Sequence, residues 1–195
     1  MGRGAGRGSG MKRASKSVAR PGRPAAHRSG SAPRPVGCAI ITVSDTRRGR
    51  EDTAGALIER LVTQAGHRVT TRAWVRDEPA ALRRAARAAL ARPAVDVLIV
   101  TGGTGLGPRD RTPDALAPLA ERAVPGFGER FRAFSAEQVG AAAWLSRAGA
   151  FVAGGRLVVM LPGSRAAVEL ALKRLLLPEL VHAVRMLGRF NSTEE

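Results

Sequence analysis

Residues 94–114 read AVDVLIVTGGTGLGPRDRTPD, and the rest of the 195-residue chain is organised around this stretch. Residues 94–100 form an apolar, β-branched run that is typical of a strand buried on both faces of a sheet. The glycines and threonines of residues 101–105 follow at once. Glycines at the end of a strand leave backbone N–H groups free and let a ligand approach them closely. The stretch therefore predicts a strand and a loop that binds an anion, most often a phosphate.

A glycine-rich loop alone also suits a tight strand-to-helix connection that binds nothing. Here the Arg109-Asp110 pair favours a ligand loop, because Asp110 is placed where a carboxylate can hold a magnesium ion that bridges phosphate oxygens. The loop lacks both the Walker A pattern and the Gly-x-Gly-x-x-Gly of a dinucleotide fold, so its spacing indicates a phosphate-bearing ligand without identifying it. Thr112 is expected to cap a helix with Pro113 at its first position and Asp114 near the positive end of its dipole.

The first predicted strand, residues 36–43, ends in the polar residues Ser44 and Asp45. Open α/β sheets place ligand residues at the carboxyl ends of their strands. Asp52 is then expected to cap a helix over residues 53–64. Ser44 and Asp45 are therefore candidates for the same site as the glycine loop.

Two further carboxylates, Asp77 and Glu78, follow the second predicted strand, residues 67–75. A carboxylate pair before Pro79 is usually helix-start chemistry, and here it complements the dipole of a helix predicted over residues 80–91. The residue types alone assign this pair a structural role.

Two helices are predicted between residues 125 and 145. The first carries three phenylalanines on one face, a stripe typical of a core or a subunit contact. The second begins at Ser135, which opens a capping-box pattern. Ser146 and Arg147 end this element, and Arg147 is a candidate for binding an anion.

Two short apolar runs between residues 149 and 161 meet at a Gly-Gly pair and predict a β-hairpin. The sequence PGS at residues 162–164 follows it and precedes a helix predicted over residues 165–177. A helix that begins at the end of a strand is a second candidate anion site. A closing helix is predicted over residues 179–187.

Strands that alternate with helices predict a three-layer α/β/α sandwich with a mostly parallel sheet and one antiparallel hairpin. If the first and third strands are neighbours, Ser44, Asp45 and the 101–110 loop line one crevice at the topological switch point of the sheet. The candidate residues named so far then belong to one site.

Charge separates the chain into two parts. Nine of its 32 basic residues, and none of its 16 acidic ones, lie within residues 1–35. This stretch of Gly, Arg, Ser, Ala and Pro buries too little apolar surface to offset the entropy of ordering. We expect a disordered basic tail over residues 1–35 and one domain over residues 36–190. The tail suits a solvated extension, a transit peptide or an arm for an acidic surface; it has no aromatic residue to stack on a base, and we expect no nucleic-acid partner.

Cys38 is the only cysteine, which excludes a disulfide within the chain and suits a reducing compartment. The apolar run around it favours a small core residue over a nucleophile. No apolar stretch reaches the roughly 18 residues that span a membrane. We therefore expect a cytoplasmic location and no membrane partner.

Five motifs occur in order along the chain. They are TGGTG at residues 101–105, PRDRTPD at 108–114, PGFGE at 125–129, LSR at 145–147 and PGS at 162–164. Together they resemble the motif series of the MoaB/MogA family of molybdopterin adenylyltransferases, over residues 36–187. This resemblance implies the MoaB/Mog-like molybdopterin-binding fold and a homotrimer or hexamer. It also implies Mg²⁺-dependent adenylyl transfer from ATP to the terminal phosphate of molybdopterin, which gives adenylyl-molybdopterin and pyrophosphate.

By the same resemblance, Asp77 falls on an active-site aspartate position. Asp77 and Asp110 are then the expected catalytic residues, which hold Mg²⁺ and orient the attacking pterin phosphate. ATP and molybdopterin are the expected substrates, and other molybdenum cofactor biosynthesis proteins are candidate partners. The residues expected to bind nucleotide or pterin are Ser44, Asp45, Thr101, Gly102, Gly103, Thr104, Gly105, Arg109, Thr112, Ser146, Arg147, Pro162, Gly163 and Ser164.

The chain departs from the family pattern at two positions. Ala54 stands where relatives tend to have a serine, and Ala166 stands where a lysine is common, with Arg165 beside it as a substitute. Two alternatives to the enzyme stay open: a family member that binds molybdopterin without adenylyl transfer, and a binding or scaffold protein that uses its basic tail. The presence of both Asp77 and Asp110 favours the enzyme.

Overall fold

The structure, a computed structural model, describes residues 1–2, 34–45 and 51–190. The chain divides into two units, residues 1–31 and 32–195, and the fold described below lies within the second. Nearly all of the predicted tail lies outside the described residues, so its disorder stays a prediction.

The domain is built on a sheet of six strands. These are β1 (Gly37–Val43), β2 (Arg68–Val75), β3 (Val97–Thr101), β4 (Arg122–Ala123), β5 (Gly149–Ala153) and β6 (Arg156–Leu161). Their order is β2-β1-β3-β6-β5-β4. The pairs β2–β1, β1–β3 and β3–β6 are parallel, whereas β5 is antiparallel to both β6 and β4. The predicted parallel sheet and its antiparallel hairpin are confirmed, and β4 is an edge strand that the sequence did not predict.

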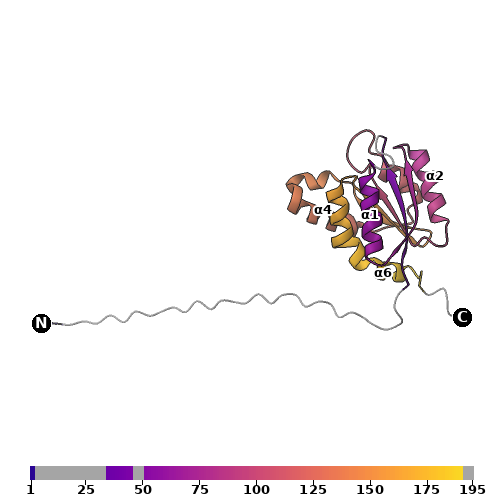
Figure 1. The fold of residues 1–195 in the computed structure, drawn as a ribbon. Helices are drawn as coiled ribbons and strands as arrows, with labels where there is room; N and C mark the ends of the chain where they lie inside the picture. The colour runs from indigo at the N-terminus through magenta and orange to yellow at the C-terminus, as the bar shows by residue number, and fades with distance from the viewer. Residues whose placement is uncertain (3–33, 46–50, 191–195) are drawn as a thin grey trace. The chain divides into compact units, whose positions relative to one another are not determined.

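Helices cover both faces of the sheet, as the predicted three-layer architecture requires (Figure 1). They are α1 (Thr53–Gln64), α2 (Pro79–Leu90), α3 (Thr112–Leu116), α4 (Pro125–Val139), α5 (Arg165–Ala171) and α6 (Leu177–Met186), with the 3₁₀ helices η2 (Ala117–Leu119) and η3 (Gly140–Leu145) and the π-helix η4 (Leu172–Leu176). The core on one face includes residues of α1, α5 and α6, and the core on the other includes residues of α2 and α3. No helix in the described part of the chain is long and apolar enough to cross a membrane.

The central strands supply both cores, because successive side chains of a strand point to opposite faces. In β1, Ile40 belongs to the core beside α1, whereas Ile41 belongs to the core beside α2. Ile99 and Leu98 divide in the same way in β3. A strand covered on both faces is apolar throughout, which explains the continuous apolar runs that predicted these two strands.

Two predicted helix starts are wrong. Thr112 does not cap α3: Arg111 is the cap residue, and the Thr112 hydroxyl instead donates a hydrogen bond to the Gly102 carbonyl oxygen at 2.8 Å. Ser135 does not open a helix either, since it lies inside α4. The helix continues to Gly140, whose φ of 60° ends it. A capping pattern therefore has no effect where the preceding residues are already helical.

The last two predicted helices form one helical run. α5 continues through η4 into α6 without a loop, and Pro178 lies in the first turn of α6. Proline has no N–H to donate, so it interrupts the α-helical hydrogen bonds of the preceding turn. The wider π turn of η4 falls at this interruption and keeps the chain helical.

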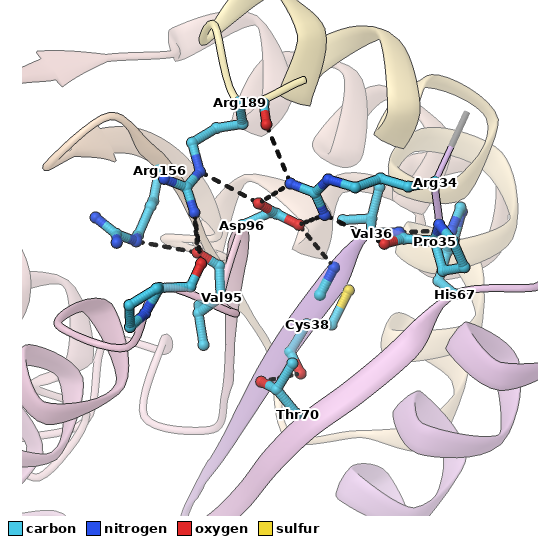
Figure 2. Close-up of polar contacts among 12 residues, drawn as sticks. Arg34, Pro35, Val36, Cys38, His67, Thr70, Val95, Asp96, Arg156 and Arg189 are labelled. Atoms are coloured by element: carbon cyan, nitrogen blue, oxygen red, sulfur yellow. Dashed lines mark hydrogen bonds and ion pairs between the residues drawn. The ribbon is translucent and has the colours of Figure 1, made fainter. Parts of the chain in front are cut away.

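A buried carboxylate at the amino ends of β1 and β3 joins segments that are far apart in the sequence (Figure 2). Asp96 accepts hydrogen bonds from the Arg34 guanidinium at 2.7 and 2.9 Å and from Arg189 Nε at 3.2 Å. It also accepts the Gly37 backbone N–H at 2.8 Å. Burial acts to raise the pKa of Asp96, but the hydrogen bonds from Arg34 and Gly37 outweigh it and hold that pKa below its ordinary value.

Cys38 lies in the same region and is fully buried. Burial, together with the charge of Asp96, raises the pKa of its thiol to about 12. A thiol with this pKa stays protonated at neutral pH and is a poor nucleophile. The predicted core role of Cys38 is confirmed.

Candidate functional site

A cavity opens at the carboxyl ends of β1 and β3, where Thr42 and Thr101 lie opposite each other. In the sheet, β2 lies on the far side of β1 and β6 lies on the far side of β3, so the strand order reverses between β1 and β3 and this is the switch point. The first and third strands are neighbours, which is the condition under which the sequence placed Ser44, Asp45 and the 101–110 loop in one crevice. The cavity measures about 430 Å³ and is lined by Thr42, Val43, Ser44, Asp45, Asp52, Thr53, Ala54, Asp77, Thr101, Gly102, Gly103, Arg109, Asp110, Gly163 and Ser164.

The glycine loop enters this cavity in a conformation that requires glycine. Gly102 has a φ of 104°, and a Cβ atom there would lie 2.2 Å from the Val43 carbonyl oxygen. Gly103 has a φ of 64°, and its Cβ would lie 2.5 Å from the Thr112 hydroxyl. Residues with a side chain rarely adopt such positive φ values, and a Cβ atom at either position would clash with its neighbour. The two glycines thus bring bare backbone to the cavity wall.

The threonine hydroxyls around the loop hold the loop in shape. Thr101 Oγ1 donates to the Pro162 carbonyl oxygen at 2.9 Å, and Thr112 Oγ1 donates to that of Gly102. The Thr112 N–H donates to the Gly103 carbonyl oxygen at 2.9 Å. Because hydroxyls also have acceptor lone pairs, Thr101 keeps acceptor capacity at the cavity wall.

The amino end of α1 forms another part of the wall. The Asp52 carboxylate accepts the Gly55 N–H at 2.8 Å, as predicted for a helix cap, and also accepts the Thr42 hydroxyl at 2.8 Å and Arg72 at 2.7 Å. Its charge is therefore matched within the protein. Ala54 lies at the same wall.

Three carboxylates from three different strand ends face the cavity: Asp45, Asp77 and Asp110. Asp45 forms an ion pair with Arg109 at 2.6 Å, and the Asp77 N–H donates to Asp45 Oδ1 at 3.3 Å. Asp110 Oδ2 accepts the Gly107 N–H at 2.9 Å. The convergence of these strand ends, which lie far apart in the sequence, gives the described lining more acidic than basic side chains.

The environment of Asp77 disfavours its charged form. Burial is the largest cause, and the negative charges of Asp45 and Asp110 add to it. A hydrogen bond from the Arg111 backbone and the charge of Arg109 act in the opposite direction and are weaker. The pKa of Asp77 is therefore raised above its ordinary value. Carboxylates with raised pKa values in a cleft are typical of functional sites.

The donor set fits a magnesium ion that is shared with substrate. Among the described residues, no three His, Cys, Asp or Glu side chains are arranged to hold a metal ion by themselves. Mg²⁺ does not need such a group, since it keeps several waters and takes one or two carboxylates plus phosphate oxygens. A cation between Asp77 and Asp110 would relieve the repulsion that contributes to the raised pKa of Asp77.

The PGS turn completes the cavity opposite the glycine loop. A Cβ atom on Gly163 would lie 3.4 Å from the Gly102 Cα, so the two glycine turns are in contact. Ser164 caps α5, and its Oγ accepts the Ala167 N–H at 3.3 Å. This hydrogen bond fixes the orientation of the Ser164 hydroxyl at the cavity wall.

The structure brings together most of the predicted site residues. Those that line the cavity are Ser44, Asp45, Asp77, Thr101, Gly102, Gly103, Arg109, Asp110, Gly163 and Ser164. Thr104 and Pro162 are next to the lining in sequence, and Thr112 and Arg147 are hydrogen-bonded to it. Gly105 and Ser146 lie one residue further from the lining, beside Thr104 and Arg147. Ligand binding by any of these residues stays a prediction.

Sequence reasoning missed the wall formed by Thr42, Asp52 and Thr53. A signal was present: Asp52 was predicted to cap a helix that follows the first strand, and the amino end of such a helix lies near the carboxyl edge of the sheet. Thr42 is a hydroxyl residue one position before the end of β1. Both features place a polar group at the edge where ligands bind.

The family described as "Probable molybdopterin binding domain" matches residues 39–182 of the chain. This span contains every residue that lines the cavity. It covers well over half of the sequence, so the match concerns the whole folded domain.

Named relatives match over nearly their full lengths. Molybdenum cofactor biosynthesis protein B of Bacillus cereus is 42% identical over 159 residues, which cover 81% of this chain and 94% of the relative. The Escherichia coli protein of the same name is 40% identical over 146 residues, which cover 75% of this chain and 86% of the relative. A crystal structure of molybdenum cofactor biosynthesis protein B has a TM-score of 0.79 at 41% identity and covers 82% of this chain and 99% of that one.

Proposed function

The chain belongs to the family of probable molybdopterin binding domains, and on this premise we propose that it acts in molybdenum cofactor biosynthesis as a molybdopterin adenylyltransferase. The terminal phosphate oxygen of molybdopterin attacks the α-phosphorus of ATP and forms a phosphoanhydride. The bond from the α-phosphorus to the bridging oxygen breaks, and pyrophosphate leaves. The observation that carries this proposal is the convergence of Asp77, Asp110 and two glycine turns on one cavity.

The protein contributes positioning and charge more than covalent chemistry in such a transfer. The backbone at Gly102 and Gly103, which no side chain covers, supports close approach of a phosphate. Arg109 is 71% exposed, so it can turn from Asp45 toward an incoming polyphosphate without losing a buried contact. These groups bind and orient the reacting phosphates.

Asp77 and Asp110 are the residues that would hold Mg²⁺. The bound ion would neutralise charge on the phosphate oxygens, which two carboxylates would otherwise repel. Asp110 is oriented for this role by the Gly107 N–H, and Asp77 by the backbone of Arg111. Backbone N–H groups therefore already orient both carboxylates.

A pterin-binding protein without transferase activity remains the alternative within the family. The pairing of two aspartates at one cavity favours the enzyme, because a site that only bound an anionic pterin would gain more from cations than from carboxylates. The scaffold alternative depends on the tail, which lies outside the described residues except at its ends.

We also propose that the protein assembles with copies of itself. Trp144 is 70% exposed, and Val139 and Leu145 beside it are 54% and 39% exposed. Large apolar side chains gathered on one exposed segment favour an interface. Light scattering of the purified protein measures the mass, for which the family resemblance implies three or six chains.

The decisive experiment measures pyrophosphate release from Mg²⁺-ATP with freshly prepared molybdopterin. We expect release by the native protein and a loss of at least about 10³-fold in Asp110→Asn, because the carboxylate acts where charge develops. Glu179→Gln, an exposed change on α6, is the matched control and should behave as the native protein. Molybdopterin binding without release by the native protein would instead support the non-catalytic alternative.

A further inference from the structure

Arg147 follows η3 and contacts the loop that carries Asp110 at several points. Its backbone N–H donates to the Thr104 carbonyl oxygen at 2.8 Å, and its Nε donates to that of Gly105 at 2.9 Å. One terminal nitrogen donates to the Asp110 carbonyl oxygen. The other donates to both carboxylate oxygens of Asp114, at 2.9 and 3.1 Å. A single residue therefore spans the loop from its first residues to the helix beyond it.

The loop between these contacts is closed on itself. The Asp110 N–H donates to the Gly107 carbonyl oxygen at 2.9 Å, and the Asp110 carboxylate accepts the Gly107 N–H at the same distance. Arg147 holds the carbonyl of Asp110 from the other side. The direction of the Asp110 carboxylate thus depends on main-chain groups that Arg147 keeps in place.

The side chain of Arg147 is committed to these partners rather than to the cavity. Neither Arg147 nor Asp114 is among the residues that line it. Asp114 is 57% exposed and matches the charge of the guanidinium. The planar fork of arginine satisfies two carbonyls and a carboxylate together, whereas the single ammonium of lysine cannot.

We propose that Arg147 is a positioning residue that sets the Asp110 carboxylate by fixing the main chain on both sides of its loop, and that it does not bind substrate phosphate. The inference rests on the proposed function, because that function assigns Asp110 its catalytic role. It replaces the expectation that Arg147 meets an anion.

Kinetics separate positioning from phosphate binding. For Arg147→Ala we expect kcat to fall about 10²-fold, as for a small misplacement of a reacting group, with little change in KM for Mg²⁺-ATP. Arg147→Lys should be as slow, because it keeps the charge but loses the fork. A direct phosphate ligand would give the opposite pattern: a raised KM in Arg147→Ala that lysine largely restores. That pattern would overturn the proposal.

A double-mutant comparison with Asp114, the carboxylate partner of Arg147, gives an independent kinetic check. Asp114→Ala removes a contact that lies outside the cavity lining, so it should also lower kcat, by less than Arg147→Ala. The double variant should be no slower than Arg147→Ala alone, because residues in one network are not additive. Arg174→Ala, which breaks the exposed 2.6 Å pair with Glu137, is the matched control and should leave kcat unchanged. Full additivity of the two losses would contradict the proposal.

Hydrogen exchange of the substrate-free protein tests the brace without any activity. In Arg147→Ala and Arg147→Lys, we expect the Asp110 and Gly107 amides to exchange faster, while the amides of β3 keep their native protection. Unchanged exchange at Asp110 would overturn the positioning role. If the native protein released no pyrophosphate but the exchange changed as expected, the brace would stand and only the proposed reaction would fail.

Discussion

The two ends of the sheet each hold an aspartate that the fold removes partly or wholly from water, and the two residues are treated in opposite ways. At the amino end, Asp96 is fully buried and accepts hydrogen bonds from Arg34, Arg189 and Gly37, which keep its pKa low. At the carboxyl end, burial and then the negative charges of Asp45 and Asp110 raise the pKa of Asp77. Burial by itself therefore does not set the direction of the pKa shift, whereas the charged and hydrogen-bonding partners do.

Strand geometry explains why the difference falls this way. Parallel strands place all their amino ends at one edge and all their carboxyl ends at the other. At the amino edge, Arg34 and Arg189, from the two ends of the domain, balance the charge of Asp96 (Figure 2). Among the described residues that line the carboxyl edge, Asp45, Asp77 and Asp110 lie together with one basic side chain, that of Arg109. In the proposed reaction, a bound Mg²⁺ ion would offset the negative charge of these described carboxylates.

The largest effect on stability is expected at the amino edge. Asp96→Ala leaves the Gly37 N–H without its side-chain acceptor and removes the carboxylate from two arginines, which keep backbone carbonyl partners and can regain water. We expect the free energy of unfolding in urea to fall by about 2–3 kcal/mol. Glu59→Ala, which breaks an exposed pair with Arg72, should cost less than about 1 kcal/mol. Equal losses of unfolding free energy in the two variants would contradict the distinction between the buried Asp96 pairs and the exposed Glu59 pair.

A smaller effect is expected where the tail meets the domain. Deletion of residues 1–33 keeps Arg34 and should leave the free energy of unfolding within about 0.5 kcal/mol of the native value. Arg34→Ala in the shortened chain should then lower it by about 1 kcal/mol, because this arginine is half-exposed and Arg189 still contacts Asp96. Pyrophosphate release should be unaffected by either change. Loss of activity on deletion of the tail would support the scaffold alternative instead.

The smallest effect, of opposite sign, is expected at Asp77. Its raised pKa means that the folded protein binds a proton more tightly than the unfolded chain. Near neutral pH the ionised group therefore costs stability, and this cost disappears as the pH falls below the ordinary aspartate pKa of about 3.9. Asp77→Asn should be more stable than the native protein at pH 7 in EDTA, and the difference should vanish toward pH 4.

The same two residues give a pH comparison that either sharpens or breaks the argument. The low pKa of Asp96 contributes stability that is complete above the ordinary aspartate pKa and is lost as the pH falls through the lower folded value. The deficit of Asp96→Ala should thus shrink at low pH, while the gain of Asp77→Asn shrinks as well. Addition of Mg²⁺ should stabilise the native protein but not Asp77→Asn. A destabilised Asp77→Asn at pH 7 would contradict the account of this carboxyl.

Much of the fold was predictable because its signals are local. The apolar runs of β1 and β3, the Asp52 cap of α1 and the Gly-Gly turn between β5 and β6 each depend on a few consecutive residues. The errors were local patterns overruled by their surroundings. Ser135 resembles a helix start, but the helix that packs Phe131 into the core was already formed there.

The sequence alone also indicated the site's chemistry, since glycines, hydroxyls and carboxylates at strand ends are compositional facts. It could not show which groups meet. Arg34 and Asp96 are separated by 62 positions, and Asp96 and Arg189 by 93. No local rule relates such residues, because their distance is decided by the order of strands in the sheet.

Arg147 illustrates the division most clearly. Its residue type and its place after η3 made it a candidate for an anion, and the sequence determined no more than that. The folded chain brings it to the carbonyls of Gly105 and Asp110 and to the carboxylate of Asp114, which use its donors. The sequence thus determined the strands, the caps and the kinds of group at the carboxyl edge, because these depend on neighbours along the chain. The tertiary structure decided which charges are matched and which are left for a ligand, because electrostatic interaction depends on distance in space.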